Sequence, residues 1–479
     1  MSDVVWPMAI AANRFGESPA LSDRDSSYTY REMASLVAGV AGALRVAGIG
    51  PGDRVAIAAA SSASYVLILH ACFQLGAVAC PLNTRLPRQA LSELIQSIGA
   101  MALLVDEYFS VIKLGHIATL RVEHLIEEAY EGAAPAPPHS LNRPATVVSS
   151  SGSTGTPKHV LHSYANHWFN ASASNENIPV EPGDRWLLSL PLFHVSGLGI
   201  LFRCMLGGGT VVVPGIGEAL EDSIPAHRIT HVSLVATQLF RLLRSRSGRE
   251  ALRRLRVILL GGSSIPAPLI REAKDQNLPI YVSYGLTEMA SQVSTSRRDA
   301  PLEALLSSGK PLVPNTVTVA PDKEVMVRGR TLFMGYLEGS VIRLPLGEDG
   351  WFATGDLGRF DEDGNLHILG RKDNMFISGG ENVHPEEIER HLCRAPGVVQ
   401  ALVVPVPCPE FGVRPAAFVR MDERHLLDPR ELEAALLDGL PKFMVPVLFL
   451  PWPDDNESAG IKDNRGLFAE LATRHRKNP

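Results

Sequence analysis

The sequence predicts an α/β protein with a large N-terminal domain and a small C-terminal one. The chain has 479 residues, which is too long for a single hydrophobic core. Short apolar strand segments alternate with amphipathic helical segments over most of its length, a pattern typical of helices layered on largely buried strands. The last part contains only a few segments, enough for a small α+β domain. We therefore expect one domain over 1–372 and a second over 373–479.

Composition and charge exclude several classes of function. Hydrophobic residues make up 45% of the chain and charged residues 20%, which is typical of a soluble globular protein. The formal net charge of −6 supplies no sustained positive field, so we expect no nucleic-acid partner. The basic stretch 241–256 has leucines between its arginines, which indicates a helix with one face in solvent.

The cysteines and the N-terminal sequence indicate in which cellular compartment we expect the protein. The five cysteines are scattered, with no Cys-x-x-Cys pair, and no histidine cluster has metal-ligand spacing. Buried free thiols in a reducing compartment are the simplest interpretation. The N-terminus has no basic region followed by an apolar core, so we expect no secretory signal and a cytoplasmic protein. The cysteines are Cys72, Cys80, Cys204, Cys393 and Cys408.

The first half of the chain contains an uncharged segment between Arg54 and Arg85 that is long enough to consider as a membrane span. Serine, glutamine, glycine and proline residues interrupt it. A strand over 55–60, a polar turn and a buried helix over 65–75 account better for the pattern, so we expect no transmembrane segment. Apolar spacing also predicts helices over 29–48 and 122–130, and strands over 102–105, 146–148, 186–190 and 210–213.

The stretch Ser149 to His159, which reads SSSGSTGTPKH, follows the strand predicted over 146–148. Gly152 and Gly155 can expose backbone N–H groups, the hydroxyls add donors, and Lys158 supplies a positive charge, so a polyphosphate is the expected guest. The spacing differs from a Walker A loop, because Pro157 precedes the lysine. By composition alone the alternative is a flexible serine/glycine linker.

Two further strands end in polar loops. The strand over 257–260 leads into Gly261-Gly262-Ser263-Ser264, and the strand over 280–283 leads into Tyr284-Gly285-Leu286-Thr287-Glu288. Loops at the carboxyl ends of strands converge in open α/β sheets, so these should meet the serine-rich loop. Tyr284 offers a flat face for a base, Thr287 a hydroxyl for phosphate and Glu288 an oxygen ligand for Mg²⁺. Taken alone, either loop also fits an ordinary turn.

The last third adds a candidate ribose ligand and the start of the small domain. Asp356 precedes a hairpin whose Asp-Gly turn lies within 361–365, where a fixed carboxylate can accept both hydroxyls of a ribose. The charged segment 370–374 is turn-prone, and Pro385 with the acids behind it begins a helix. Strands over 398–404 and 416–420 and a helix over 432–440 complete the small domain.

Five motifs in one order, SSSGSTGTPKH, YGLTE, FATGD, GRKDN and GIKDNR, resemble the acyl-adenylate-forming superfamily of acyl-CoA synthetases, peptide-synthetase adenylation domains and beetle luciferases. The resemblance spans nearly the whole chain. It implies an N-terminal domain of layered α/β sheets with a small β-barrel, followed by a mobile C-terminal domain. It also implies an ATP-dependent ligase that forms an acyl-adenylate with Mg²⁺ and passes the acyl group to coenzyme A.

The resemblance also implies a role for each motif residue. Thr287 would bind the α-phosphate, Glu288 the Mg²⁺, and the catalytic lysine would be Lys462. Tyr284 would stack on adenine beside Gly285, Gly262 and Ser263, while Asp356 and Arg371 would hold the ribose. Asp373 would be the hinge between domains, and Gly380 would lie where the arm of CoA passes. The pyrophosphate end of ATP would be held by Ser151, Gly152, Ser153, Thr154, Gly155, Thr156 and Lys158.

Two positions depart from the common family pattern: His159 stands where glycine is usual, and Ile461 separates Gly460 from Lys462. The Gly-Ile-Lys form, together with the stretches 190–203, 231–239 and 284–295, resembles the 2-succinylbenzoate–CoA ligases of menaquinone synthesis. This resemblance implies an acyl site beside His194 and Ser291. We expect Arg203 to balance the charge of a substrate with two carboxylates, although an arginine at a helix end is often part of a structural ion pair.

Other functions remain open at this point. One is an aryl- or acyl-CoA synthetase with a different acid, and another is an adenylating enzyme that serves a carrier protein. A non-catalytic nucleotide-binding relative is a third. The expected partners are a small-molecule carboxylic acid, ATP and CoA, with no nucleic acid, and a homodimer is the expected assembly.

Overall fold

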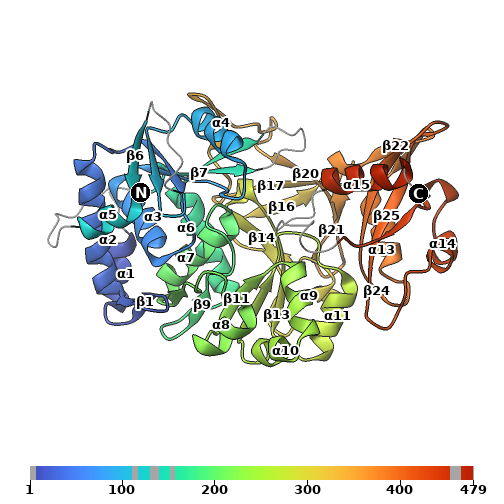
Figure 1. The fold of residues 1–479 in the computed structure, drawn as a ribbon, viewed down its shortest axis with the longest axis horizontal. Coiled ribbons are helices and arrows are strands. Elements are labelled where there is room, and N and C mark those ends of the chain that lie inside the picture. Colours follow the sequence, from blue (N-terminus) through green and yellow to red (C-terminus); the bar gives the residue numbers. More distant parts are fainter. Residues whose placement is uncertain (1–6, 110–116, 130–139, 151–156, 454–464, 478–479) are drawn as a thin grey trace.

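The computed structural model describes residues 7–109, 117–129, 140–150, 157–453 and 465–477. It confirms the predicted fold class: two large sheets and their helices form a wide N-terminal part, and a small α+β part follows it (Figure 1). In the described ranges, the structure contains no helix with the length and apolar character that a membrane crossing requires. Cys72, Cys80 and Cys204 are buried free thiols, as predicted, whereas Cys393 and Cys408 are only half-buried.

The first large sheet has eight strands, parallel on one side and antiparallel on the other. The segment bounded by Arg54 and Arg85 supplies the predicted strand and buried helix, and also a second parallel strand at 78–81 that was not predicted. Ser62 caps this helix, α3, by accepting from the N–H of Tyr65, and Gly76 ends it in the left-handed region. The strands, in sheet order, are β19 (Val341–Arg343), β18 (Gly335–Glu338), β8 (Lys158–Ser163), β7 (Pro144–Ser150), β4 (Val78–Pro81), β3 (Arg54–Ala58), β5 (Ala102–Val105) and β6 (Ala118–Arg121).

The second large sheet has nine strands, and its central strands are parallel. Strand β12 occupies the predicted residues 257–260, whereas the segment predicted over 186–190 forms a shorter strand. In sheet order the strands are β15 (Lys310–Pro311), β14 (Ser291–Thr295), β13 (Ile280–Leu286), β12 (Val257–Leu260), β11 (His231–Leu234), β9 (Arg185–Leu187), β10 (Thr210–Val212), β1 (Pro19–Ser22) and β2 (Ser27–Thr29).

Helices fill the space between the two sheets and cover their outer faces. The largest hydrophobic core joins residues of both sheets with α2, α3 and α7, so these helices lie between the sheets. Helix α4 packs on the outer face of the eight-stranded sheet, and α8 to α11 pack on that of the nine-stranded sheet. The helices are α1 (Pro7–Phe15), α2 (Tyr30–Val46), α3 (Ala63–Leu75), α4 (Arg88–Ile98), α5 (Val122–Glu127), α6 (Tyr164–Asn177), α7 (Val195–Gly207), α8 (Leu220–Ala226), α9 (Ala236–Arg244), α10 (Arg246–Leu252), α11 (Ala267–Asp275) and α12 (Leu302–Leu305).

A four-stranded antiparallel sheet stands where the small β-barrel was expected. Its strands are β16 (Thr316–Val319), β17 (Glu324–Arg328), β20 (Phe352–Phe360) and β21 (Leu366–Arg371). A shared core joins this sheet to both large sheets, with Val160 of β8, Val293 of β14 and Val325 of β17 among its members. The three sheets therefore meet at one place, and the predicted site residue Tyr284 packs against this core.

The C-terminal part has hydrophobic clusters of its own, built from residues after 375. The predicted start of a helix at Pro385 is confirmed. The predicted boundary at 372/373 falls within a short 3₁₀ turn, η2 (Lys372–Asn374). The other elements are β22 (Phe376–Ser378), β23 (Glu381–Val383), α13 (Pro385–Leu392), β24 (Val398–Cys408), β25 (Gly412–Met421), α14 (Pro429–Leu437), η3 (Lys442–Met444), β26 (Phe449–Pro451) and α15 (Arg465–Lys477).

Candidate active site

The predicted ribose ligands, Asp356 and Arg371, lie opposite each other on β20 and β21. The buried carboxylate of Asp356 accepts a hydrogen bond from the Tyr284 hydroxyl at 2.6 Å and pairs with the Arg371 guanidinium at 3.1 Å. Burial, and then the charge of Asp356, raise the pKa of Tyr284 well above its usual value, so its hydroxyl remains a donor. The structure thus joins three residues from three separate motifs in one hydrogen-bonded group.

Gly285 shows why the loop after Tyr284 needs a residue without a side chain. An added Cβ at this position would lie 2.1 Å from the carbonyl oxygen of Ser291, on the neighbouring strand β14. The β13–β14 register shifts between Tyr284 and Gly285, so the strand bulges here. This bulge leads directly into a 3₁₀ turn, η1 (Thr287–Met289), which carries the two residues predicted to bind phosphate and metal.

The predicted metal ligand Glu288 faces Lys158 across a tyrosine that the sequence did not point to. The Tyr336 hydroxyl donates to Glu288 Oε1 at 2.8 Å, and Lys158 Nζ lies 5.3 Å from the centre of the Tyr336 ring. Burial, and then the Glu288 charge, raise the pKa of Tyr336. Tyr336 reaches this place because β18 pairs with β8, with Tyr336 opposite Val160. A local sequence pattern gives no signal for such a pairing.

The predicted acyl residues Arg203 and Ser291 are also neighbours. Arg203, on α7, is only 1% exposed and donates from Nη2 to Ser291 Oγ at 3.3 Å. Its Nε has no hydrogen-bond partner, and the guanidinium makes no ion pair with any carboxylate that the structure describes. Burial lowers the pKa of Arg203 to about 10, so it remains charged at neutral pH. The structural ion pair considered as the alternative is therefore not formed within the described residues.

The backbone beside Arg203 is strained. Ala290 has φ 57° and Ser291 has φ 145°, conformations that residues with a side chain rarely adopt. Both follow η1 directly, so the strain lies between the phosphate and acyl ends of the site. His194 is the residue before α7 and packs against Phe193, with ring centres 4.7 Å apart. It begins the helix that carries Arg203.

His159 is buried. Its ring bonds Ser97 at 2.9 Å and Ser149 at 3.0 Å, so it ties β8 to α4 and β7. This contact accounts for a histidine where the family usually has glycine. The other predicted loop residues, Ser151, Gly152, Ser153, Thr154, Gly155 and Thr156, lie outside the described residues, as do Lys462 and Ile461.

Four predicted residues are less closely assembled. Asp373 lies in η2 and approaches Arg371, with Oδ2 3.4 Å from Nη2. Gly262 and Ser263 lie in the loop after β12, and Gly262 has φ 85°. Gly380, with φ 91°, forms the turn between β22 and β23, well away from β13 and β14 (Figure 1). The structure does not bring Gly380 to the other site residues.

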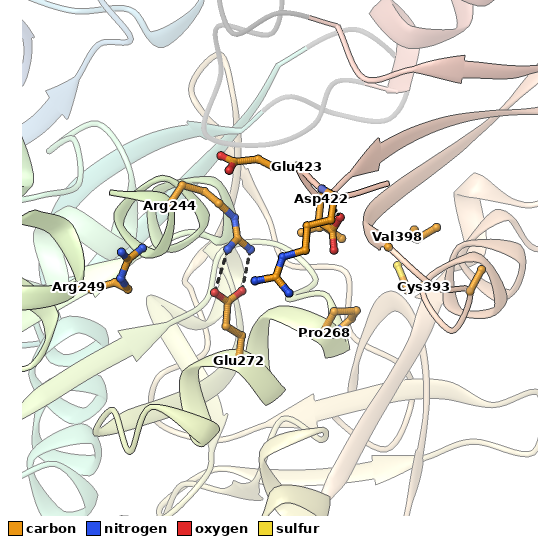
Figure 2. A pocket seen from close by; sticks show the side chains of 12 residues that line it. Arg244, Arg249, Pro268, Glu272, Cys393, Val398, Asp422 and Glu423 are labelled. Carbon is orange, nitrogen blue, oxygen red and sulfur yellow. Dashed lines mark hydrogen bonds and ion pairs between the residues drawn. The ribbon is translucent and has the colours of Figure 1, made fainter. Parts of the chain in front are cut away.

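A cavity of about 530 Å³ lies elsewhere, between α9–α11 and the C-terminal part (Figure 2). On one side of the cavity, Arg244 and Glu272 form a bidentate ion pair, with N–O distances of 2.9 and 2.7 Å. Asp422 and Glu423 lie on the other side. Its lining contains basic and acidic side chains but none of the predicted site residues. We therefore place the chemistry at the junction of the three sheets.

Comparison with known proteins identifies the family to which the chain belongs. Residues 8–337 match the family described as AMP-binding enzyme, and residues 387–454 match the AMP-binding enzyme C-terminal domain. The chain belongs to the AMP-binding enzyme family, as its motifs predicted.

Particular relatives are similar over nearly the whole length. The 2-succinylbenzoate–CoA ligase of Escherichia coli K12 is 35% identical over 469 residues, 98% of each chain. The Bacillus subtilis o-succinylbenzoate CoA synthetase (MenE) in complex with the acyl-adenylate intermediate OSB-AMP superimposes with a TM-score of 0.84 at 31% identity, covering 100% of this chain and 99% of that one. The same B. subtilis enzyme in complex with ATP and magnesium ion has a TM-score of 0.81 at 32% identity, covering 94% and 96%.

Proposed function

We propose that this chain is an ATP-dependent 2-succinylbenzoate–CoA ligase of menaquinone biosynthesis. It joins the acid to AMP with release of pyrophosphate, and then transfers the acyl group to CoA with release of AMP. The observation that carries the substrate assignment is the buried guanidinium of Arg203, which has no carboxylate partner among the described residues. A buried charge without a partner is costly unless a ligand supplies the opposite charge.

A substrate with two carboxylates fits this arrangement. One carboxylate attacks the α-phosphorus of ATP, while the other pairs with Arg203 at the far end of the acyl site. Arginine suits this task because its planar fork binds a carboxylate through two parallel hydrogen bonds. Ser291 already orients one arm of the fork, at 3.3 Å. Gly199, one turn before Arg203, leaves room beside the guanidinium, since an added Cβ would lie 3.1 Å from Nη2.

The nucleotide fits the other end of the site. Tyr284 offers its ring to adenine, and Asp356, held by Tyr284 and Arg371, accepts the ribose hydroxyls. The phosphates then point toward Thr287, Lys158 and the serine-rich loop. Catalysis needs no enzyme nucleophile, because positioning and stabilisation of charge on phosphate oxygens are sufficient for attack by the substrate carboxylate.

Magnesium fits the same end. In the described residues no three acids, histidines or cysteines form a metal cluster. A Mg²⁺ that arrives with ATP does not require one, because it keeps several waters and takes phosphate oxygens with one or two carboxylates. Glu288 is the carboxylate that would hold it, and the Tyr336 hydroxyl fixes one of its oxygens. When bound, the ion neutralises charge on the phosphates.

Transfer to CoA requires a second arrangement of the C-terminal part. The turn that carries Gly380 lies away from the site, so we propose that this part rotates about Asp373 and brings the turn to the adenylate. Such lid movements often limit turnover. We propose the domain boundary at 372/373 for the same reason. We also propose that the enzyme is a homodimer that works in the cytoplasm, and light scattering after gel filtration tests the dimer.

The decisive experiment measures AMP formation with ATP, Mg²⁺ and CoA for a panel of acids: 2-succinylbenzoate, benzoate, 4-coumarate and a medium-chain fatty acid. We expect a strong preference for 2-succinylbenzoate. Preference for another acid would retain the mechanism and reject the substrate. Acyl transfer only to a phosphopantetheinylated carrier protein would reject CoA as the acceptor, and ATP binding without pyrophosphate release would reject catalysis.

A further inference from the structure

A buried histidine supports the turn that carries Thr287 and Glu288. His162, on β8, is fully buried, and its Nε2 lies 2.7 Å from the carbonyl oxygen of Thr287. The same carbonyl oxygen accepts the N–H of Ala290 at 3.0 Å, which closes the short turn η1. His162 is therefore the side chain that holds this turn from the adjacent sheet.

The hydrogen bonds behind His162 fix its protonation. A carbonyl oxygen only accepts, so Nε2 must carry the proton. Burial lowers the pKa of His162 to about 4, so the ring is neutral and Nδ1 is an acceptor. Thr146 Oγ1 lies 3.2 Å from this Nδ1 and 2.8 Å from Nε2 of His167. Thr146 therefore donates to His162 and accepts from His167.

His167 ends the series inside the core. Burial lowers its pKa well below the usual value, and its ring stacks on Phe202 with centres 4.9 Å apart and planes at 15°. Its Nδ1 has no hydrogen-bond partner. The hydrogen bonds thus run in one direction, from α6 through β7 and β8 to the Thr287 carbonyl. Such series strengthen each member, so the last bond gains from the two behind it.

Helix α6 supports the same loop at a second point. Asn170, three residues after His167, donates to the carbonyls of Met289 and Gln292 at 3.0 and 2.8 Å. The loop therefore rests on side-chain donors on both sides of its strained residues Ala290 and Ser291. A strained backbone keeps its conformation only when its surroundings determine it.

We infer that His162 is a positioning residue for ATP: through its hydrogen bond to the Thr287 carbonyl it holds the Thr287 hydroxyl where the α-phosphate binds. The inference rests on the proposed function, which assigns that role to Thr287. A displacement of about 1 Å in a binding group lowers the rate by about 10²-fold, so loss of this one donor has a measurable effect.

The test compares His162→Gln with His162→Asn. A glutamine amide places an N–H near the position of Nε2, whereas an asparagine amide reaches only that of Nδ1 and leaves the Thr287 carbonyl without this donor. We expect His162→Asn to lower kcat/KM for ATP by about 10- to 100-fold without changing KM for the acid. We expect His162→Gln to remain within about threefold of the wild type.

His70→Asn is the matched control, because His70 is a fully buried histidine on α3 whose pKa burial also lowers to about 4. It should lower the melting temperature and leave the kinetics with ATP unchanged. A His162→Asn variant that loses stability but keeps wild-type kinetics with ATP would overturn the inference. Equal losses in the Gln and Asn variants would do the same, because they would show that the ring rather than the donor matters.

Calorimetric binding of Mg-ATP, without any acid, separates this inference from the proposed function. His162→Asn should weaken that binding at least about tenfold relative to His162→Gln. A wild type that binds Mg-ATP but does not activate 2-succinylbenzoate would reject the proposed substrate and leave this comparison intact. Equal affinities in the two variants would overturn the inference.

Discussion

The binding role that we propose for Arg203 has a cost in stability. Its guanidinium is 1% exposed and its Nε is unpaired in the described residues. Replacing a poorly compensated buried charge by an apolar side chain often stabilises a protein. Removing the charge also removes the group that would pair with the second carboxylate of the substrate. Activity and stability should therefore change in opposite directions.

We predict that Arg203→Met lowers kcat/KM for 2-succinylbenzoate by at least about 30-fold and raises the free energy of unfolding by about 1–2 kcal/mol. Activity with an acid that has one carboxylate should change little. The control is Arg185→Met, because Arg185 donates to the carbonyl of His227 and the hydroxyl of Ser22 and its loss leaves both without that donor. Thermal unfolding measures the change in stability, and steady-state kinetics with both acids measures the change in kcat/KM. A less stable Arg203→Met that is equally impaired with both acids would refute the assignment.

Arg465 and Glu389 form a largely buried ion pair, in contrast to Arg203, which has no carboxylate partner among the described residues. Arg465 Nη1 lies 2.7 Å from Glu389 Oε1, and the two side chains are only 23% and 15% exposed. Burial raises the pKa of Glu389 despite its partner. Because the folded-state pKa lies above the unfolded one, the contribution of Glu389 to stability is fully present below the unfolded pKa and is lost as the pH rises through the folded pKa.

We predict that Arg465→Met lowers the free energy of unfolding at neutral pH by about 3 kcal/mol, because it leaves a carboxylate buried without its charge partner. The loss should shrink as the pH falls from about 8 to about 5, since the unpaired Glu389 becomes protonated more readily. Melting temperatures across this range measure it. Arg31→Met, which breaks an exposed pair with Glu17, should cost under about 1 kcal/mol at every pH. A loss independent of pH would contradict the prediction.

At the scale of elements, the bulged strand β13 connects the residues that we propose for the nucleotide and acyl ends of the site. Gly285→Ala would place a Cβ 2.1 Å from the Ser291 carbonyl oxygen. We predict a loss of about 1–3 kcal/mol in stability together with a raised KM for ATP, because β14 and the turn after Gly285 must move. Gly50→Ala is the control, since its nearest neighbour would be 3.7 Å away. Unchanged kinetics in Gly285→Ala would show that the bulge is not needed for positioning.

The elements that the sequence predicts well are those with an apolar pattern. The strands at 102–105 and 257–260 match the prediction residue for residue, and the helix over 29–48 is α2. Helix α6 is different. Its buried face carries Asn166, His167 and Asn170. The two asparagines donate to backbone carbonyls, those of Arg330 and Met289 among them, and His167 bonds the Thr146 hydroxyl, so apolar spacing does not reveal this helix. Apolar spacing therefore does not predict this supporting helix, because the residues with which it supports the site are polar.

At the scale of the whole molecule, the motifs name the site residues but not their neighbours. The group of Tyr284, Asp356 and Arg371 follows from motifs that the family places together. Tyr336 enters only through the pairing of β18 with β8, and His162 only through the meeting of β8 with η1. Contacts between distant segments depend on sheet order, which local patterns do not encode. The sequence therefore supplies candidate ligand-binding residues, but not the side chains that support them.

The contact between the two parts of the molecule gives the last prediction. The Arg420 guanidinium, on β25, lies 4.9 Å from the ring centre of Phe240 on α9 and 5.0 Å from that of Trp452. Phe240 belongs to the N-terminal part and the other two to the C-terminal part. A cation–π contact at a half-exposed site contributes about 0.5–1 kcal/mol. This contact is one of several between the parts, and we propose that it favours the arrangement in which Gly380 lies away from the site, which we assign to adenylate formation.

We therefore predict that Phe240→Leu slows adenylate formation by about two- to fivefold and leaves thioester formation from preformed adenylate unchanged or faster. Pyrophosphate release and thioester formation, measured separately, give the two rates. Phe169→Leu is the matched control, because Phe169 contacts Arg330 at 3.7 Å within the N-terminal part and that contact does not cross between the parts. If Phe240→Leu slows both half-reactions equally, the contact does not select between arrangements. A selective loss of the first step alone requires that the two parts separate before CoA reacts, since a contact that persisted through both steps would affect both.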